Sequence, residues 1–339
     1  MEKMSLSQLY ATFDNQYCGG YPSPLHIFVL FPRIGIDSLP DLASRAEAGL
    51  HLEPLSENVY EIVLSLRKRY AQGFVVTYPH IWNLFIRPVE SSVAAAQVTD
   101  TWLRKVYPIL SKAYVESEQL LDILDSLKST NPDYRVEVRD YLLKTFREPE
   151  TSRTWPRDQP YIRRILERSM ESRYLLDAIR FGFHAGEAFF ETRISRNGHL
   201  VYYSGGKQGF SDLSRLILQP LSKIALENRK RFSGRERKIV GDEVVISPVM
   251  MKPENPLTER DLVGIKLALC ESYTTSVIHG GNPWLLVSVI DRGDGSYFDI
   301  YGYEDEVVIV PFNRASPESL TKLYGLIREL VPSAKSELS

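Results

Sequence analysis

The sequence has few of the residues and runs that mark specialised protein classes. Its two cysteines, Cys18 and Cys270, match neither a CxxC motif nor a Cys/His zinc spacing, so neither a disulfide framework nor a structural zinc is indicated. The longest apolar runs, such as Ile27–Phe31 and Val307–Val310, are far shorter than the ~20 residues of a membrane span. The chain also starts with a polar stretch that lacks a hydrophobic signal core. We therefore expect a soluble, cytoplasmic protein without a membrane partner.

Signatures of the common enzyme classes are absent as well. The chain contains no Walker A loop, GxGxxG fingerprint, GxSxG elbow, protein-kinase motif set or zinc-deaminase signature. Its six histidines form no HxH, HExxH or HxxxH pattern. These absences favour a non-catalytic protein without a cofactor.

The composition predicts a folded chain of more than one domain. Apolar residues make up 43% and charged residues 25% of 339 residues, as in ordinary soluble proteins, and this length accommodates two domains. Pro149, Pro156 and Pro160 interrupt a charged segment with almost no aliphatic residues. We therefore expect an N-terminal α+β domain over residues 1–148, a linker over 149–158, and a C-terminal α+β domain over 159–339, with a subdivision near 252–256.

The apolar patterning predicts an α+β fold in which antiparallel β-meanders are flanked by helices. The same order of helix, strands and helix occurs three times, with meander strands starting at Phe74, Ala178 and Trp284, 104 and 106 residues apart. This spacing raises the hypothesis of three similar units. The Asn197-Gly198 pair predicts a hairpin turn in the second of them.

Capping residues and prolines place several helices. The first unit is expected to open with a helix that starts at Ser56 and stops near Gly73, although an alternating-strand interpretation of the same stretch is open. Pro220 should kink or split a helix that runs from Leu213 to Ile224, while Thr258 and Ser316 each precede a helix as its N-cap.

The segment His279-Gly280-Gly281-Asn282-Pro283 favours the end of a helix. Gly280 would supply a left-handed C-cap, and Pro283 would prevent continuation. A general base at His279 is the less favoured interpretation.

Charge is distributed unevenly along the chain. The formal net charge is −2, but the segment 193–238 contains eleven basic and three acidic residues, a local net charge of +8. Arg215, Lys223 and Lys230 fall on one side of a predicted helix and form a basic stripe. Such a stripe would pair with a nucleic-acid backbone, and aromatic residues on a neighbouring strand could stack on unpaired bases. The predicted nucleic-acid-binding residues are Lys207, Arg215, Lys223, Arg229, Lys230, Arg231, Arg235, Arg237, Lys238, Tyr202 and Tyr203.

A glycine-rich loop lies beside this segment. Gly205, Gly206 and Gly209 surround Lys207 between a predicted strand and a predicted helix. Backbone N–H groups in such a loop could approach a phosphate, with the helix N-terminus adding positive potential. A plain connection in which Ser211 or Asp212 caps the helix is the other interpretation.

These features lead to one main functional hypothesis and two alternatives. The main hypothesis is a non-catalytic nucleic-acid-binding subunit of a larger intracellular assembly. The first alternative is a metal-dependent nuclease or phosphodiesterase in which Asp291, Asp294 and Asp299 bind Mg²⁺ or Mn²⁺, although turn formation also explains these aspartates. The second alternative is a protein–protein scaffold whose repeated units each offer one sheet face. Assembly is favoured over solitary action because Tyr and Phe together number 33.

Overall fold

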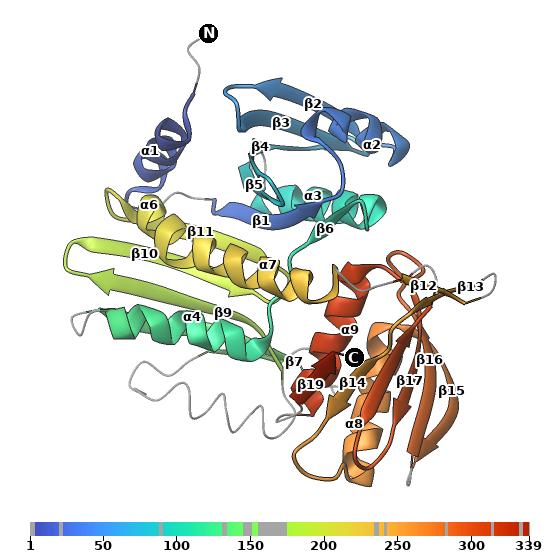
Figure 1. Ribbon diagram of the computed structural model, residues 1–339. Helices are drawn as coiled ribbons and strands as arrows, with labels where there is room; N and C mark the ends of the chain where they lie inside the picture. Colours follow the sequence, from blue (N-terminus) through green and yellow to red (C-terminus); the bar gives the residue numbers. More distant parts are fainter. Residues whose placement is uncertain are drawn as a thin grey trace. The chain divides into compact units, whose positions relative to one another are not determined.

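The chain folds as an α+β protein with antiparallel sheets, and a computed structural model describes its helices and strands (Figure 1). The description covers residues 4–19, 23–87, 91–130, 134–144, 151–154, 175–233, 237–240, 243–281, 284–312, 315–331 and 335–338. The predicted fold class is thus confirmed. No helix within these residues is long and apolar enough to cross a membrane.

Internal contacts divide the chain into two compact units. The first comprises residues 1–143, 152–168 and 176–226, and the second comprises 144–151, 169–175 and 227–339. This division differs from the predicted one because strands from both sides of residues 149–158 pair in one sheet. The predicted linker and domains stay a prediction about which parts fold independently.

The first unit is built on a sheet of eleven described strands. Their order is β2-β3-β4-β5-β1-β11-β10-β9-β7-β8, and β6 pairs with β1. The elements up to α7 are α1 (Leu6–Tyr17), β1 (Leu25–Pro32), η1 (Ile36–Ser38), α2 (Leu39–Arg45), β2 (Gly49–Pro54), β3 (Val59–Leu66), β4 (Arg69–Tyr78), β5 (Ile81–Arg87), α3 (Ser92–Val106), β6 (Leu110–Lys112), α4 (Ser117–Thr130), β7 (Arg135–Lys144), β8 (Thr151–Thr154), β9 (Leu175–Ala185), β10 (Ala188–Ser195), β11 (His199–Gly205), α6 (Gly209–Leu213), the π-helical turn η2 (Ser214–Leu218) and α7 (Gln219–Ser233).

The centre of the first sheet is buried on both faces. Every residue of β1 except its last is buried, as expected of a strand covered on both sides. Phe28 and Trp82 belong to a core on one face, together with side chains of α2 and α3. On the other face, the rings of Phe13 and Phe85 pack against Phe210, with centroids 4.8 and 5.9 Å from that ring.

The prediction of a helix from Ser56 to near Gly73 is wrong, because β3 and the first half of β4 lie in this stretch. Burial in β3 follows the alternation of Ile62, Leu64 and Leu66. Arg67 and Lys68, which suggested a basic last turn of a helix, form the tight turn between the two strands with φ values of +49° and +66°. Left-handed conformations at both positions match the twist of a two-residue hairpin. The alternating-strand interpretation was the correct one, and the equivalence of the three units stays a prediction.

Pro220 changes the form of its helix, and the predicted kink or split stays a prediction. The stretch from Gly209 to Ser233 is helical, but it passes through the π-helical turn η2 just before this proline. The N–H of Gln219 donates to the carbonyl of Ser214, five residues earlier. A proline cannot donate to the residue four positions before it, so the helix widens by one residue at this point.

The second unit contains a smaller sheet of six described strands in the order β15-β16-β17-β18-β14-β19. A separate hairpin pairs β12 with β13. The elements are β12 (Arg237–Val240), β13 (Glu243–Ile246), β14 (Val249–Lys252), α8 (Glu259–Ser272), β15 (Thr274–Gly281), β16 (Trp284–Ile290), β17 (Tyr297–Gly302), β18 (Val307–Pro311), α9 (Pro317–Leu330) and β19 (Lys335–Leu338).

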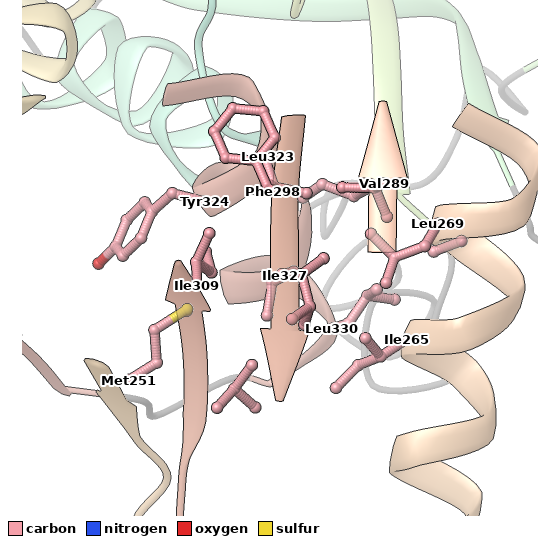
Figure 2. Close-up of a cluster of buried hydrophobic side chains, with 14 of the residues drawn as sticks. Met251, Ile265, Leu269, Val289, Phe298, Ile309, Leu323, Tyr324, Ile327 and Leu330 are labelled. Carbon is pink, nitrogen blue, oxygen red and sulfur yellow. The ribbon is translucent and has the colours of Figure 1, made fainter. Parts of the chain in front are cut away.

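The core of the second unit lies between this sheet and α8 and α9. Figure 2 shows Val289 and Phe298 of the sheet among side chains such as Leu269 of α8 and Ile327 of α9. Both helices begin as predicted. Thr258 closes a capping box with Asp261, and the Ser316 hydroxyl accepts from the N–H of Ser319.

Candidate functional site

The glycine-rich loop is closely packed around its own backbone. The N–H of Gly206 donates to the carbonyl of Phe189, and the N–H of Gly209 donates to the carbonyl of Gly206. A Cβ added at Gly205 would lie 2.2 Å from the Tyr202 hydroxyl, and one at Gly209 would lie 2.7 Å from the Phe189 carbonyl. Close approach of strand and helix therefore accounts for these two glycines.

An internal carboxylate occupies the N-terminus of the helix after this loop. Asp14, buried on α1, accepts from the N–H of Phe210 at 2.7 Å and from the N–H of Ser211 at 3.2 Å. The hydroxyl of Ser211 also donates to it. Four N–H groups that a phosphate could use, those of Gly206, Gly209, Phe210 and Ser211, are thus taken by the chain itself.

The two predicted stacking tyrosines differ in accessibility. Tyr202 is fully buried against Tyr17 and Phe210, and its burial raises the pKa of its hydroxyl above the ordinary value. Tyr203 is half-buried, and the guanidinium of Arg180 lies over its ring at 4.0 Å. Burial also raises the pKa of the Tyr203 phenol, and the charge of Arg180 opposes that rise. Tyr202 is therefore closed to base stacking, and Arg180 covers one face of the Tyr203 ring.

The predicted basic stripe separates into paired and exposed cations. In the first unit, Arg215 pairs with Asp212 at 3.0 Å, while Lys207 and Lys223 are exposed. Glu227 is exposed four residues after Lys223 and adds a negative charge to the same helix.

In the second unit, Arg229 is drawn into the packing between α7 and α9. It pairs with the buried carboxylate of Glu318 at 3.0 Å. Arg231 lies over the ring of Tyr324 at 5.5 Å from its centroid, and Lys230 is exposed. Arg237 and Lys238 belong to β12, and Arg235 lies outside the described residues. The segment is therefore less basic at its surface than its sequence suggests.

The three predicted metal ligands are each held by local hydrogen bonds. Asp291 accepts from the N–H of Gly293, and Asp294 accepts from the N–H and hydroxyl of Ser296. Asp299 lies on β17 and accepts from the hydroxyl of Ser288 at 2.6 Å. Among the residues that the structure describes, no three His, Cys, Asp or Glu side chains form a group that could hold a metal ion.

The helix end expected at His279 is wrong, because α8 ends at Ser272 and residues 274–281 form β15. The ring of His279 stacks on Trp284 of the next strand, with centroids 4.1 Å apart. Gly280 has no left-handed backbone and pairs with Leu285. The β-branched residues Thr274, Thr275, Val277 and Ile278 are the signal that favours a strand.

In the part of the chain that the structure describes, α8 and α9 cover one face of the second sheet, and the side chains of the opposite face are half-buried. We call this opposite face the uncovered face. Buried and half-buried residues alternate along β17 and β18, and the buried set faces α8 and α9. On the opposite face, a cross-strand row of half-buried side chains runs over five strands. In order from β14 to β15, it consists of Met250, Val308, Tyr301, Leu286 and His279. Leu285, Val287 and Val289 of β16 point to the core, while Trp284 and Leu286 lie on the uncovered face, so this strand is apolar on both sides.

The strand at the edge of this face is exposed and apolar. Ile278 is 64% exposed, Val277 39% and Trp284 36%. Pairing of β15 with β16 shifts register between Val277 and His279, which leaves Ile278 in a β-bulge without a partner residue. We call Val277, Ile278, His279 and Trp284 the edge surface.

Acidic residues outnumber basic ones around the edge surface, although Lys266 of α8 lies against Gly280 of β15. Residues 249–312 include ten acidic and four basic residues, a net charge of −6. Glu271 is exposed just before β15, and Glu304 and Asp305 are exposed in the turn after β17, at the end of the sheet where Trp284 lies. Sequence reasoning noted this last acidic turn but not the uncovered strand beside it. The signal that could have found it is the apolar content of both faces of β16 in a chain that supplies helices for one.

Comparisons with known proteins give no functional information beyond this geometry. No family model and no curated protein matches the chain. Among solved structures, it is similar to the immunity protein TplEi of T6SS from Pseudomonas aeruginosa complexed with "L" peptide, with 11% sequence identity over 95% of this chain and 98% of that chain. The TM-score is 0.16, so this likeness carries no argument.

Proposed function

We propose that this chain is a non-catalytic protein-binding subunit, which holds a partner protein on the uncovered face and edge of its second sheet. The observation that carries the proposal is the concentration of exposed apolar side chains in the second unit, all but Leu267 of α8 lying on its strands or the turns that follow them. Of the ten large apolar residues exposed in the described part of the chain, seven belong to the second unit. They are Leu267, Val277, Ile278, Trp284, Ile290, Tyr303 and Phe312. Exposed apolar clusters rimmed by polar residues are typical of protein interfaces.

Charge indicates the chemistry of the partner. The exposed carboxylates of Glu271, Glu304 and Asp305 favour a partner surface that carries lysine or arginine beside its apolar side chains. They disfavour a polyanion, whose phosphates would be repelled at this place. A protein partner with basic and apolar side chains is thus the occupant that this surface fits best.

Peptide binding to the full chain tests the proposal. Peptides of constant apolar content and graded net charge are titrated, and we expect affinity to rise with positive charge and to fall with added salt. The double variant Ile278→Ser and Trp284→Ser should weaken binding of the basic peptides at least about tenfold, because exposed aromatic and aliphatic anchors carry most interface energy.

The chain offers a matched control on its first unit. Val93 is 64% exposed, like Ile278, and Tyr70 is 56% exposed. The double variant Val93→Ser and Tyr70→Ser should bind the peptides as tightly as the unaltered chain. Equal losses in both double variants, or equal affinity for acidic and basic peptides, would contradict the proposal.

Nucleic-acid binding is a second candidate function, which the exposure of Lys207 and Lys223 supports. We propose that contact of this kind would be weak and non-specific, because Asp212 and Glu227 partly offset the cations of the same helical stretch. The test is binding of single- and double-stranded DNA and RNA as a function of salt. The double variant Lys207→Glu and Lys223→Glu should flatten the salt dependence, and an unchanged slope would remove this candidate.

A further inference from the structure

The free edge of the second sheet points to how a partner would be held, an inference that rests on the proposed function. β15 pairs with β16 alone in the described sheet. An edge strand of this kind directs every second pair of its backbone N–H and C=O groups away from the sheet. These groups are donors and acceptors that another strand can use.

This edge also lacks the features with which proteins commonly block such pairing. Lysine, proline and inward charges are the usual protections of edge strands. Residues 274–281 include no Lys, Arg, Asp, Glu or Pro. The bulge at Ile278, and Lys266 of α8, whose Nζ would lie 3.0 Å from a Cβ added at Gly280, protect the far end of this strand. The four residues from Thr274 to Val277 stay in regular pairing with β16.

The side chains around this stretch specify what could pair with it. Val277 and Ile278 offer apolar contacts at the end of the regular stretch, and His279 with Trp284 continues them onto the uncovered face. Glu271 stands before the strand, and Glu304 and Asp305 stand at the opposite end of the sheet. A second copy of this chain would bring the same carboxylates to the same place, so like charges would oppose pairing of two such edges.

We propose that an extended segment of a partner protein, with alternating apolar residues and flanking lysine or arginine, adds to β15 as a further strand. The backbone of Thr274–Val277 supplies the hydrogen bonds of this pairing. Ile278 and Trp284 supply the apolar contacts, and the acidic residues at both ends select a basic segment. This mode recognises the shape and spacing of an extended chain more than its exact sequence.

Backbone methylation of a peptide tests the pairing directly. The probe is a synthetic peptide of alternating valine and threonine with lysines at both ends, titrated against the full chain by calorimetry. Two methylated forms carry N-methyl groups on the odd or on the even residues. Because alternate N–H groups of a strand point to opposite sides, one form loses its hydrogen bonds to β15 and the other does not. We expect one form to lose at least about tenfold in affinity and the other to bind like the parent peptide.

Each other outcome has a definite meaning. If the parent peptide and both methylated forms bind equally well, and the Ile278→Ser, Trp284→Ser variant still loses affinity, strand addition is overturned while protein binding at this surface stands. If the parent peptide and the graded basic peptides all fail to bind, both proposals fail. Concentration-dependent dimerisation by sedimentation, blocked by the peptide and by Ile278→Lys but not by Val93→Lys, would show that a second copy is the occupant and would overturn the choice of partner.

Amide hydrogen exchange gives an independent readout. Bound peptide should slow exchange at the outward-facing amides of residues 274–277 and leave β2, an edge strand of the first sheet, unchanged. Protection that spreads over the uncovered face but spares β15 would overturn the proposal in favour of docking on the face alone.

Discussion

The two edges β2 and β15 show how differently this chain treats exposed strands. β2 carries Glu53 and Pro54 at its end, and each of the two strands has a helix packed beside it, α2 beside β2 and α8 beside β15. β15 carries no charge or proline and ends in an exposed apolar bulge. An edge strand without charge or proline can pair with other chains. The difference between β15 and β2 therefore supports the proposed use of β15 in binding. The two sheets differ in a similar way. The centre of the first sheet is covered on both faces, whereas α8 and α9 cover one face of the second sheet.

The largest expected effect is in the doubly covered centre of the first sheet. Phe85 is fully buried on β5 and packs against Phe13 and Phe210. Phe85→Ala should destabilise the first unit by about 3–5 kcal/mol, because it removes a large side chain from a closed core. Leu286→Ala, on the half-buried row of the second sheet, should cost about 1 kcal/mol or less, as for partly exposed side chains. Denaturant unfolding measures both, and equal losses would contradict the contrast between the sheets.

A somewhat smaller effect is expected at the internal carboxylate of Asp14. Asp14→Ala leaves the N–H groups of Phe210 and Ser211 without their acceptor, and the first of these is buried. A buried donor without a partner costs about 1–3 kcal/mol. The control is Asp212→Ala, which removes only an exposed pair with Arg215 and should cost about 0–1 kcal/mol. If the two variants are equally stable, Asp14 does not hold the helix start.

The sequence could predict the parts of the fold that local chemistry determines. The caps at Thr258 and Ser316 follow from residues a few positions apart. Pro220 indicated an irregular helix at its position, although not the π-helical form that the structure has. The segment 56–73 does not form the predicted helix, because its basic residues Arg67 and Lys68 form a hairpin turn. Strand β15 does not end a helix as predicted, because the pair Gly280 and Gly281 belongs to the strand.

The candidate site was less accessible to sequence reasoning. Asp14 reaches the glycine-rich loop across 196 positions, and Glu318 neutralises Arg229 across 89. Neither neighbour can be found by counting local charge. The edge surface depends on which strand ends a sheet, and this is a property of the topology rather than of residues 274–281 alone.

A buried histidine between β1 and β11 should make the stability of the first unit depend on pH. The Nε2 atom of His199 lies 3.0 Å from the Nδ1 atom of His26, and the ring of His199 stacks on that of Phe28. Burial lowers the pKa of His199 to about 3, and the charges of His26, Lys112 and Arg193 act in the same direction, while Asp100 opposes them. The unfolded chain would take up this proton near pH 6.5, so it binds more protons than the folded chain below that pH.

Stability from this group is therefore complete above about pH 6.5 and is lost as the pH falls toward 3, at a rate of about 1.4 kcal/mol per pH unit well below 6.5. Between pH 8 and pH 5.5 the first unit should lose about 1.4 kcal/mol through His199 alone. His199→Gln should remove this part of the slope, as measured by urea unfolding at several pH values. A variant with the same slope as the unaltered chain would exclude His199 as its source.

The smallest expected effect on stability belongs to the residue with the largest expected effect on binding. Ile278 is 64% exposed and has no partner residue in β16, so Ile278→Lys removes little packing and breaks no register. Its free energy of unfolding should change by no more than about 0.5 kcal/mol, as for surface substitutions in general. Val93→Lys, at equal exposure on α3, should behave in the same way in unfolding but not in peptide binding. A loss of several kcal/mol in Ile278→Lys would show that the bulge serves the core of the second unit, and the comparison of the two edges would then concern folding rather than recognition.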